Sequence, residues 1–192
     1  MAEIKKRVTQ IKNVEATCQE TIAQIQTFPV PEATGLSCPP ITFIIDDFKK
    51  RIKLKDMWLS PPFYTHVGGY KVCLCVQTDV TIRTNHYEFE QSSSVSVSIH
   101  LLAGEFDEHL TWPFPGAMFT ITAINQRANK CNRSVNLKVV GKDTLCFRSR
   151  QIDGGLGLGF GAPDFLLHSY LSGYLSRDDC LKIMVCRIQF LP

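Results

Sequence analysis

The spacing of hydrophobic residues divides the chain into two segments with different periods. Residues 1–27 repeat apolar positions at helical spacing, whereas from residue 41 onward apolar and polar residues alternate in short runs separated by Gly, Pro, Asn or Asp. The first pattern is typical of an amphipathic helix and the second of antiparallel strands. The sequence therefore predicts a helix followed by an all-β domain.

The N-terminal segment has the repeat of a coiled coil. Its apolar residues follow one another at intervals of 4, 3, 7, 4 and 3, interrupted at Glu15. β-branched residues at both seam positions disfavour a parallel dimer and favour three or four strands. Residues 1–28 are therefore predicted to form a trimerisation helix, although so short a segment also fits an amphipathic helix folded back on its own domain. The predicted seam consists of Ile4, Val8, Ile11, Cys18, Ile22 and Ile25.

Prolines mark the boundary between the two segments. Pro29 and Pro31 follow the helical repeat, and Pro39 and Pro40 precede the first β-like run. Proline lacks the amide donor and clashes with the preceding turn, so it cannot continue a helix. We expect a proline-rich linker over residues 29–40 and a β domain over residues 41–192.

The alternating runs predict an antiparallel β-sandwich. In the clearest run, residues 94–101, apolar residues occupy one face and serines the other, so one face is expected to be buried and one solvated. Residues 164–171 instead predict two turns of helix, capped by Asp164 and closed by a left-handed Gly173. Strands are predicted near residues 42–45, 59–63, 70–78, 95–102, 118–125, 135–140 and 181–190.

Composition and charge narrow the class of protein. The 192 residues carry a formal net charge of +3, with Lys and Arg scattered along the chain, so they form no basic stripe of the kind that binds nucleic acid. The chain has no run of 18 apolar residues, and its N-terminus lacks the apolar stretch of a signal peptide. A soluble, cytoplasmic protein without direct membrane insertion is expected.

Cysteines and histidines supply few candidates for chemistry. Most of the eight cysteines lie in apolar β-like runs and are expected to be buried thiols. Cys73 and Cys75 point the same way on a strand, but no second Cys or His pair stands at zinc-site spacing. None of the five histidines sits in a nucleophile motif, so a hydrolase remains only an alternative and no metal or cofactor is expected. The five histidines are His66, His86, His100, His109 and His168.

A glycine-rich stretch at residues 154–161 contains five glycines. A dinucleotide-binding site would need a preceding parallel strand, a crossover helix and a downstream acid, and the surrounding sequence predicts none of them. Glycines let a backbone bend sharply or lie close to another chain. The stretch therefore suits contact with a peptide backbone better than contact with a phosphate.

Three stretches resemble the MATH domain of the TRAF family, the tumour necrosis factor receptor-associated factors. The first is LSPPFY at residues 59–64 with GYKVCL at 69–74, the second is GEFDEHLTWPF at 104–114, and the third runs from GFG at 159–161 to DDCL at 178–181. The second stretch is most similar to the member that serves Toll and interleukin-1 receptors. The resemblance covers about residues 41–190, and the heptad segment stands where TRAF proteins carry a coiled coil.

This resemblance implies an eight-stranded antiparallel β-sandwich, a parallel homotrimer and an edge strand that receives an extended peptide by β-augmentation. In that mode backbone hydrogen bonds supply affinity, and pockets for side chains supply selectivity. The positions expected to contact the peptide are Cys75, Gln77, Ser98, Phe147, Leu158, Gly159, Phe160, Gly161 and Ala162.

Several of these positions depart from the family. Cys75 stands where many members carry an arginine, and Gln77, Ser98 and Ala162 stand where aromatic residues are common. Residues 143–146 replace a clamp that is often rich in serine. A positive contact for acidic or aromatic peptide side chains is therefore absent at Cys75, and the usual receptor motifs are not expected to transfer unchanged.

The resemblance implies a trimeric adaptor that binds the cytoplasmic tails of TNF-receptor-like or Toll/interleukin-1-type receptors, or their adaptors. The alternative is a MATH-type substrate-recognition module of a ubiquitin pathway. The Cys/His array of a RING or zinc finger does not occur in these residues, so the chain as given is not expected to ligate ubiquitin or to be an enzyme.

Overall fold

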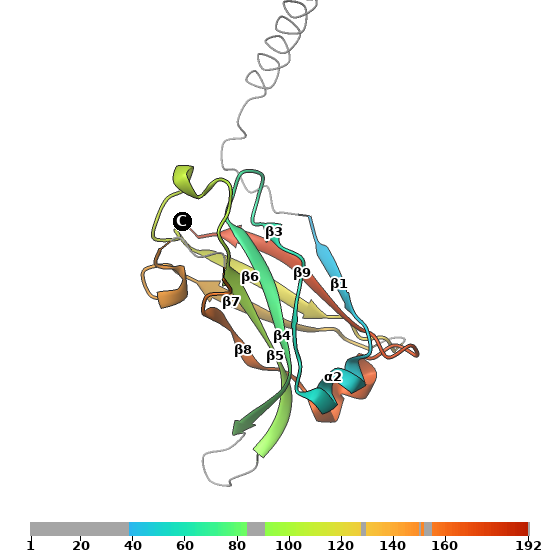
Figure 1. Ribbon diagram of the computed structural model, residues 1–192. Coiled ribbons are helices and arrows are strands. Elements are labelled where there is room, and N and C mark those ends of the chain that lie inside the picture. The colour runs from blue at the N-terminus through green and yellow to red at the C-terminus, as the bar shows by residue number, and fades with distance from the viewer. Residues whose placement is uncertain (1–38, 84–90, 128–129, 150, 152–154, 192) are drawn as a thin grey trace, which may run out of the picture. The chain divides into compact units, whose positions relative to one another are not determined.

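The computed structural model describes residues 39–83, 91–127, 130–149, 151 and 155–191 (Figure 1). The predicted coiled-coil helix and almost all of the predicted linker lie outside these residues. The described chain forms strands β1 (Ile41–Ile45), β2 (Met57–Leu59), β3 (Phe63–Tyr64), β4 (Lys71–Arg83), β5 (Gln91–Leu101), β6 (Ala117–Ala123), β7 (Arg133–Val139), β8 (Gly159–Leu167) and β9 (Leu181–Phe190). Its helical elements are α2 (Phe48–Leu54) and the 3-10 turns η1 (Asp107–His109), η2 (Leu145–Phe147) and η3 (His168–Gly173).

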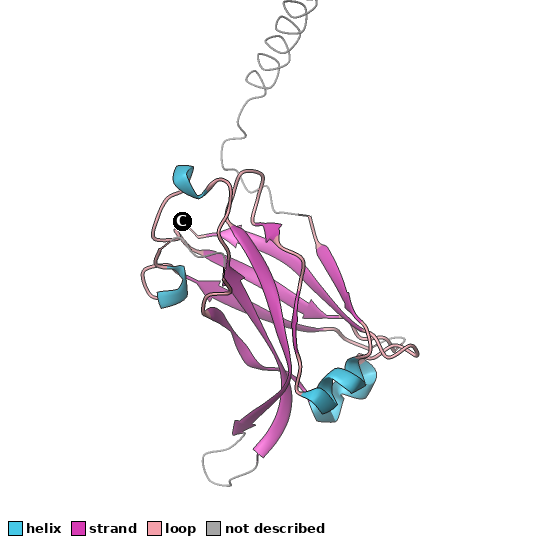
Figure 2. Cartoon of the chain, in the orientation of Figure 1, coloured by secondary structure: helices cyan, strands magenta, loops and turns pink. Residues whose placement is uncertain are grey.

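The strands form two antiparallel sheets packed face to face, as predicted. Sheet A has the order β1-β9-β6-β7, and sheet B has the order β2-β4-β5-β8 with β3 also paired to β4. Sheet B lies in front of sheet A in Figure 1, and the helical elements lie in the connections between strands (Figure 2). The eight-stranded sandwich is confirmed when β2 and β3 are counted as one interrupted strand along β4.

That interruption has a local cause. The sequence predicts a single strand near residues 59–63, but the structure breaks it into β2 and β3 at Pro61 and Pro62. Neither proline has an N–H to donate to a ladder, so pairing stops there and resumes at Phe63 opposite Val72.

The core lies between the two sheets. Strands β4 and β5 direct Leu74 and Ile99 inward, and β9 directs Ile183 toward them, all with no exposed surface. Two phenylalanines in connections, Phe114 and Phe147, complete the packing with ring centroids 5.4 Å apart. Alternation of inward and outward residues along each strand therefore builds the hydrophobic centre of the domain.

The predicted helix at residues 164–171 is wrong over its first half. Residues 159–167 form β8, which pairs with β5, and only η3 is helical. Asp164 is exposed within the strand, and the only described glycines with positive φ are Gly68 and Gly116, so Gly173 is not a left-handed stop. Pairing of Leu166 and Leu167 with β5 gives these residues backbone partners that a helix would otherwise supply. Phe165 is buried in the core.

The serine-bearing face of β5 is less solvated than the alternation predicts. Ser94 has no exposed surface, and Ser96 and His100 are 8% and 9% exposed. Ser94 Oγ donates to the carbonyl of Pro163 at 2.9 Å, because β8 bulges at this point and brings its carbonyl over the serine. Hydrogen bonds rather than solvent satisfy this face.

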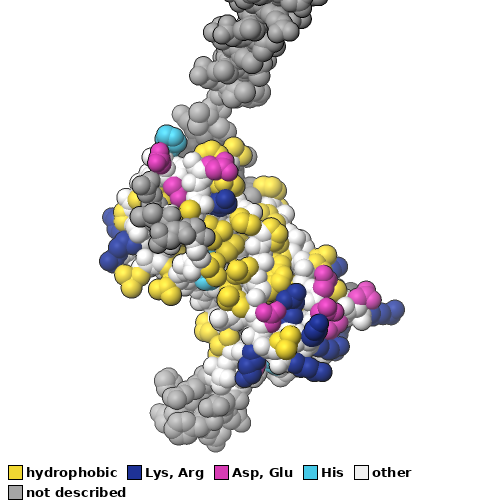
Figure 3. All heavy atoms as spheres, in the orientation of Figure 1, with side chains coloured by type: hydrophobic (Ala, Val, Ile, Leu, Met, Phe, Trp, Pro, Cys, Tyr) yellow, Lys and Arg dark blue, Asp and Glu magenta, His cyan; other side chains and the backbone are white. Residues whose placement is uncertain are grey.

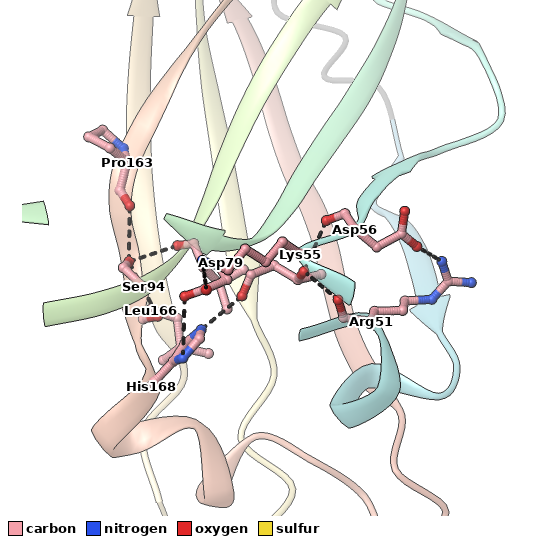
Figure 4. A network of polar contacts seen from close by, with 10 residues as sticks. Arg51, Lys55, Asp56, Asp79, Ser94, Pro163, Leu166 and His168 are labelled. Carbon is pink, nitrogen blue, oxygen red and sulfur yellow. Dashed lines mark hydrogen bonds and ion pairs between the residues drawn. The ribbon is translucent and has the colours of Figure 1, made fainter. Parts of the chain in front are cut away.

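A polar network joins α2, the bulge in β4 and η3 (Figure 4). Asp79 lies at that bulge, where Lys55 Nζ is 3.5 Å from one carboxylate oxygen and His168 Nδ1 is 4.0 Å from the other. The second ring nitrogen of His168 bonds to the carbonyl of Thr78 at 2.8 Å. The Thr78 hydroxyl in turn donates to the carbonyl of Arg51 at 3.1 Å.

Helix α2 gathers basic residues that the sequence reading treated as scattered. It carries Lys49, Lys50, Arg51 and Lys53, but aspartates on neighbouring segments face them. Lys49 lies 3.5 Å from Asp179, and Arg51 pairs with Asp56. Opposite charges therefore lie side by side at this end of the domain, as the mixed blue and magenta spheres in Figure 3 show.

Candidate functional site

Strand β8 forms one edge of sheet B and is the first part of the candidate site. Its N-terminal half pairs with β5, with Gly159 opposite His100 and Gly161 opposite Ser98. Within the described residues, no strand pairs with the other side of β8. An edge of this kind presents unpaired backbone N–H and C=O groups, which can pair with another extended chain.

The C-terminal half of β8 is less available. Pro163 has no N–H to donate, and its carbonyl already accepts the hydroxyl of Ser94. Arg133 of β7 donates through Nε to the carbonyl of Phe165 at 3.1 Å. The part of the edge that is open to an incoming strand is therefore residues 159–162.

Two glycines in this open part permit an unusually close approach of β8 to β5. A Cβ at Gly159 would lie 2.2 Å from Nε2 of His100, and one at Gly161 would lie 2.0 Å from the carbonyl oxygen of Val97. Any side chain at these positions would push the two strands apart. The protein's own packing of β8 against β5 therefore requires both glycines. Because they have no side chains, the outer surface at these positions is also open to another chain.

The outward residues of sheet B form rows across the strands, and we call this surface the outer face. One row runs from Leu59 through Cys75 and Ser98 to Gly161, and the next contains Met57. Figure 3 looks onto this side, with hydrophobic side chains gathered over its middle and charged ones toward the α2 end. The outer face consists of Met57, Leu59, Cys73, Cys75, Gln77, Ser96, Ser98, His100, Gly159 and Gly161.

His100 ties the start of β8 to the outer face. Its Nδ1 is 2.8 Å from the carbonyl oxygen of Gly157, and its Nε2 is 2.9 Å from Oγ of Ser98. A carbonyl only accepts, so Nδ1 carries a proton, and in the neutral ring Nε2 accepts the Ser98 hydroxyl. The Gly159 backbone lies against the ring, and His100 is 9% exposed, so His100 links the start of β8 to β5.

The two thiols of the outer face are buried and protonated at neutral pH. Cys73 and Cys75 are each 2% exposed and lie outside the core cluster between the sheets. Burial, with the neighbouring Cys75 thiol as a smaller cause, raises the pKa of Cys73 to about 11. Burial also raises the pKa of Cys75, while a hydrogen bond with Ser98 opposes that rise. Neither is therefore a reactive nucleophile.

The structure separates the sequence-predicted site residues into three groups. Gly159, Gly161, Ser98, Cys75 and Gln77 come together on the outer face, where Gln77 is exposed and Cys75 is recessed. Leu158, just before β8, is 75% exposed.

The remaining predicted residues point toward the core. Phe160 lies opposite Ile99 and packs half-buried against the core, and Ala162 is 9% exposed. Phe147 has no exposed surface and packs against Phe114, so it cannot touch a bound peptide directly. Alternation along β8 is the reason, because neighbours of outward glycines must face inward.

Sequence reasoning did not place Met57, Leu59, His100 or Arg133 at the peptide-binding face or edge. Met57 and Leu59 are 47% and 40% exposed on β2, beside Gln77 and Cys75. The period-two pattern of residues 94–101 contained the signal for His100, which shares the face of the serines. No sequence signal pointed to Arg133, because its bond to β8 depends on how the two sheets pack.

Comparisons with known proteins agree with this geometry. The sequence profile of the TRAF/meprin MATH domain matches residues 55–184. The chain belongs to the TRAF/meprin MATH-domain family. The matched residues include the outer face and the open edge of β8, so the resemblance seen in the sequence is confirmed. The matched residues run from the start of β2 into β9, so they include strands of both sheets.

Individual relatives are TRAF proteins. TNF receptor-associated factor 6 of Homo sapiens is 28% identical over 184 residues, which cover 92% of this chain and 32% of that protein. The corresponding factor of Rattus norvegicus is 30% identical over 127 residues, covering 65% of this chain and 22% of its own length. TNF receptor-associated factor 5 of Mus musculus is 28% identical over 129 residues, covering 66% and 21%. The chain spans only 32% or less of these relatives.

A solved structure also has this fold. TRAF5 of Notothenia coriiceps superposes with a TM-score of 0.63 at 20% sequence identity, covering 99% of this chain and 90% of that chain. Among the described residues, no helix is long and apolar enough to span a membrane. The same residues contain no group of three or more His, Cys, Asp or Glu side chains placed to hold a metal ion.

Proposed function

We propose that this chain is a trimeric cytoplasmic adaptor rather than an enzyme, and that it holds extended peptides along the open edge of β8. The observation that carries the proposal is this edge, where residues 159–162 face no strand on one side within the described chain. A peptide strand added there would continue sheet B by β-augmentation. Its partners would be tails of TNF-receptor-like or Toll/interleukin-1-type receptors, or signalling adaptors.

The proposed division of labour follows the sequence. Residues 1–28 would form the trimerising coiled coil, residues 29–40 the linker and residues 41–192 the peptide-binding sandwich. Three weak sites on one trimer act at high effective concentration on clustered receptors, which raises avidity by about 10² to 10⁴ when the geometry permits. The relatives' name, TNF receptor-associated factor, is consistent with this class of partner.

The test uses synthetic peptides that tile the cytoplasmic tails of TNF receptors, Toll-like and interleukin-1 receptors and their adaptors. Binding to the full chain is measured by fluorescence anisotropy. For each peptide that binds, single backbone amides are N-methylated in turn, which removes one hydrogen-bond donor at a time. β-Augmentation predicts that affinity falls at alternate residues, because every second amide of a strand faces its neighbour.

Two results would contradict the proposal. Loss of affinity that does not alternate along the peptide would exclude strand addition, as would amide NMR shifts on binding that avoid residues 159–162. A chain that binds peptides but is monomeric at all concentrations would instead favour the substrate-recognition module of a ubiquitin pathway, because avidity would then play no part.

A further inference from the structure

The middle of the outer face, beside the open edge, carries no Lys, Arg, Asp or Glu side chain. Its ten positions hold Met, Leu, Cys, Gln, Ser, His and Gly, and the nearest basic residue along β4 is Lys71, at one end of the face. The salt bridges among the described residues lie around α2, the bulge in β4 and the start of η3, beyond the C-terminal end of β8 and not beside Gly161. A charged group brought over the middle of the face would therefore lose water without gaining an ionic partner.

The polar groups of this face already have partners within the protein. The Ser98 hydroxyl bonds to His100 at 2.9 Å, and the Ser96 hydroxyl donates to Oε1 of Gln77 at 3.2 Å. The Cys75 thiol is recessed and held neutral by burial. The outer face therefore offers an incoming carboxylate few hydrogen-bond donors to replace its lost water.

The exposed side chains at the two borders of the outer face are apolar. Leu59 and Met57 stand on the β2 side, and Leu158 stands just before β8 with 75% of its surface exposed. In Figure 3 hydrophobic side chains cover the middle of this side of the domain. Covering such atoms with an aliphatic side chain is favourable by about 25 cal/mol per Å² of apolar surface removed from water.

The geometry of the edge determines which peptide side chain lies over the outer face. A strand added outside β8 would lie about 4.8 Å from it, and β5 lies about the same distance on the other side. Gly161 has no side chain to block the way, and Ser98 opposite it is small. A peptide side chain placed over Gly161 can therefore lean over the β8 backbone, with its tip toward Ser98.

We propose that the peptide bound at β8 carries an uncharged aliphatic residue, such as Leu or Met, at the position over Gly161, and that an acidic residue there is rejected. This inference rests on the proposed function, since it requires a peptide strand at that edge. It names the class of segment that the edge selects: an extended stretch with an aliphatic rather than an acidic anchor.

The experiment starts from a phage-displayed library of random extended peptides selected on the full chain. The residue over Gly161 is identified by cross-linking or NMR contacts to Gly161 and Ser98. Two synthetic peptides that differ only there, one with Leu and one with Glu, are then compared by fluorescence anisotropy. We expect the Leu peptide to bind at least about tenfold more tightly, because the Glu carboxylate would be desolvated without a partner.

Variants of the protein test whether the uncharged outer face causes the preference for Leu over Glu. Ser98→Arg places a cation beneath the peptide and should reduce or reverse the preference for Leu over Glu. Gln77→Arg makes the same charge change on an exposed position of the face, so it keeps the test decisive if Ser98→Arg fails to fold. Val67→Arg is the matched control, since Val67 is fully exposed in the β3–β4 loop, and it should leave the preference unchanged.

The outcomes separate the two proposals. Equal affinities for Leu and Glu, with alternating sensitivity to N-methylation retained, would overturn the aliphatic selectivity and leave β-augmentation standing. A preference for Glu in the unmodified chain would do the same. Absence of binding by every selected peptide would overturn both. A preference for Leu that Ser98→Arg or Gln77→Arg diminishes and Val67→Arg does not would support the inference.

Discussion

The ring of His100 occupies the space that a side chain at Gly159 would need, since a Cβ there would lie 2.2 Å from Nε2. The ring cannot swing aside freely, because its two nitrogens bond to Gly157 and Ser98. The pair thus fixes the start of β8 against β5. The position of the candidate edge depends on this contact, which joins residues 59 positions apart in the chain.

Gly159→Ala should therefore lower the free energy of unfolding by about 1 to 3 kcal/mol, because the methyl group must displace a pinned ring or the strand. Urea-induced unfolding measures the change. Gly155→Ala is the matched control, because a Cβ at Gly155 meets nothing within 4 Å. The control should be neutral or stabilising by up to about 1 kcal/mol through the unfolded state. Equal effects of both changes would show that the contact between His100 and Gly159 is not restrictive.

Replacing Phe147 and replacing Phe160 by alanine should cost different amounts of stability. Phe147→Ala removes a fully buried ring and should cost about 3 to 5 kcal/mol of stability. Phe160→Ala removes a half-buried ring at the edge of the core and should cost less, about 1 to 2 kcal/mol. Thermal and urea unfolding of both variants check the order. A larger cost for Phe160 would mean that the β8 edge, rather than η2, anchors this corner of the core.

Alkaline pH should destabilise the domain through Cys73. The pKa of its thiol is about 11 in the folded protein and 9.0 in the reference state. The unfolded chain therefore loses the proton first, and stability falls as pH rises from about 9 to about 11 by up to roughly 3 kcal/mol. Urea unfolding at about pH 8 and about pH 10.5 measures the loss of stability.

Cys73→Ala supplies the control for this pH effect, because it removes the ionising thiol and leaves the lysines, the tyrosines and the other cysteines in place. The variant should lose less stability between the two pH values than the unmodified chain does. Identical losses in both proteins would assign the alkaline destabilisation to other groups, among them Tyr70, whose pKa is also raised by burial.

The heptad seam predicts the oligomeric state. Ile22→Asp should yield monomers with an intact β domain, because the carboxylate would be buried in the seam. Light scattering across a dilution series should give about three times 21.6 kDa for the unmodified chain. Asn13→Asp adds the same charge on the opposite side of the predicted helix and should leave the trimer unchanged. Trimers that survive Ile22→Asp would refute the seam.

The sequence alone determined the class of the β domain and its family. The change of period at residue 41 and the alternation in residues 94–101 predicted antiparallel strands, because a half-buried strand must repeat every two residues. The motifs around Gly69 and Gly159 predicted the MATH domain, and the profile match confirms it. These features are local, so they can be read from neighbouring residues.

Tertiary structure decided the features that depend on distant partners. Residues 164–167 carry a plausible helix start, yet they belong to a strand, because Leu166 and Leu167 pair with Val95 and Ser94 of β5. Phe160 faces the core because register places Gly159 and Gly161 outward, which no composition argument can fix. The neutral outer face is made by β2, β4, β5 and β8 together. Each strand contributes only a few residues, so the surface exists only after the sheet has formed.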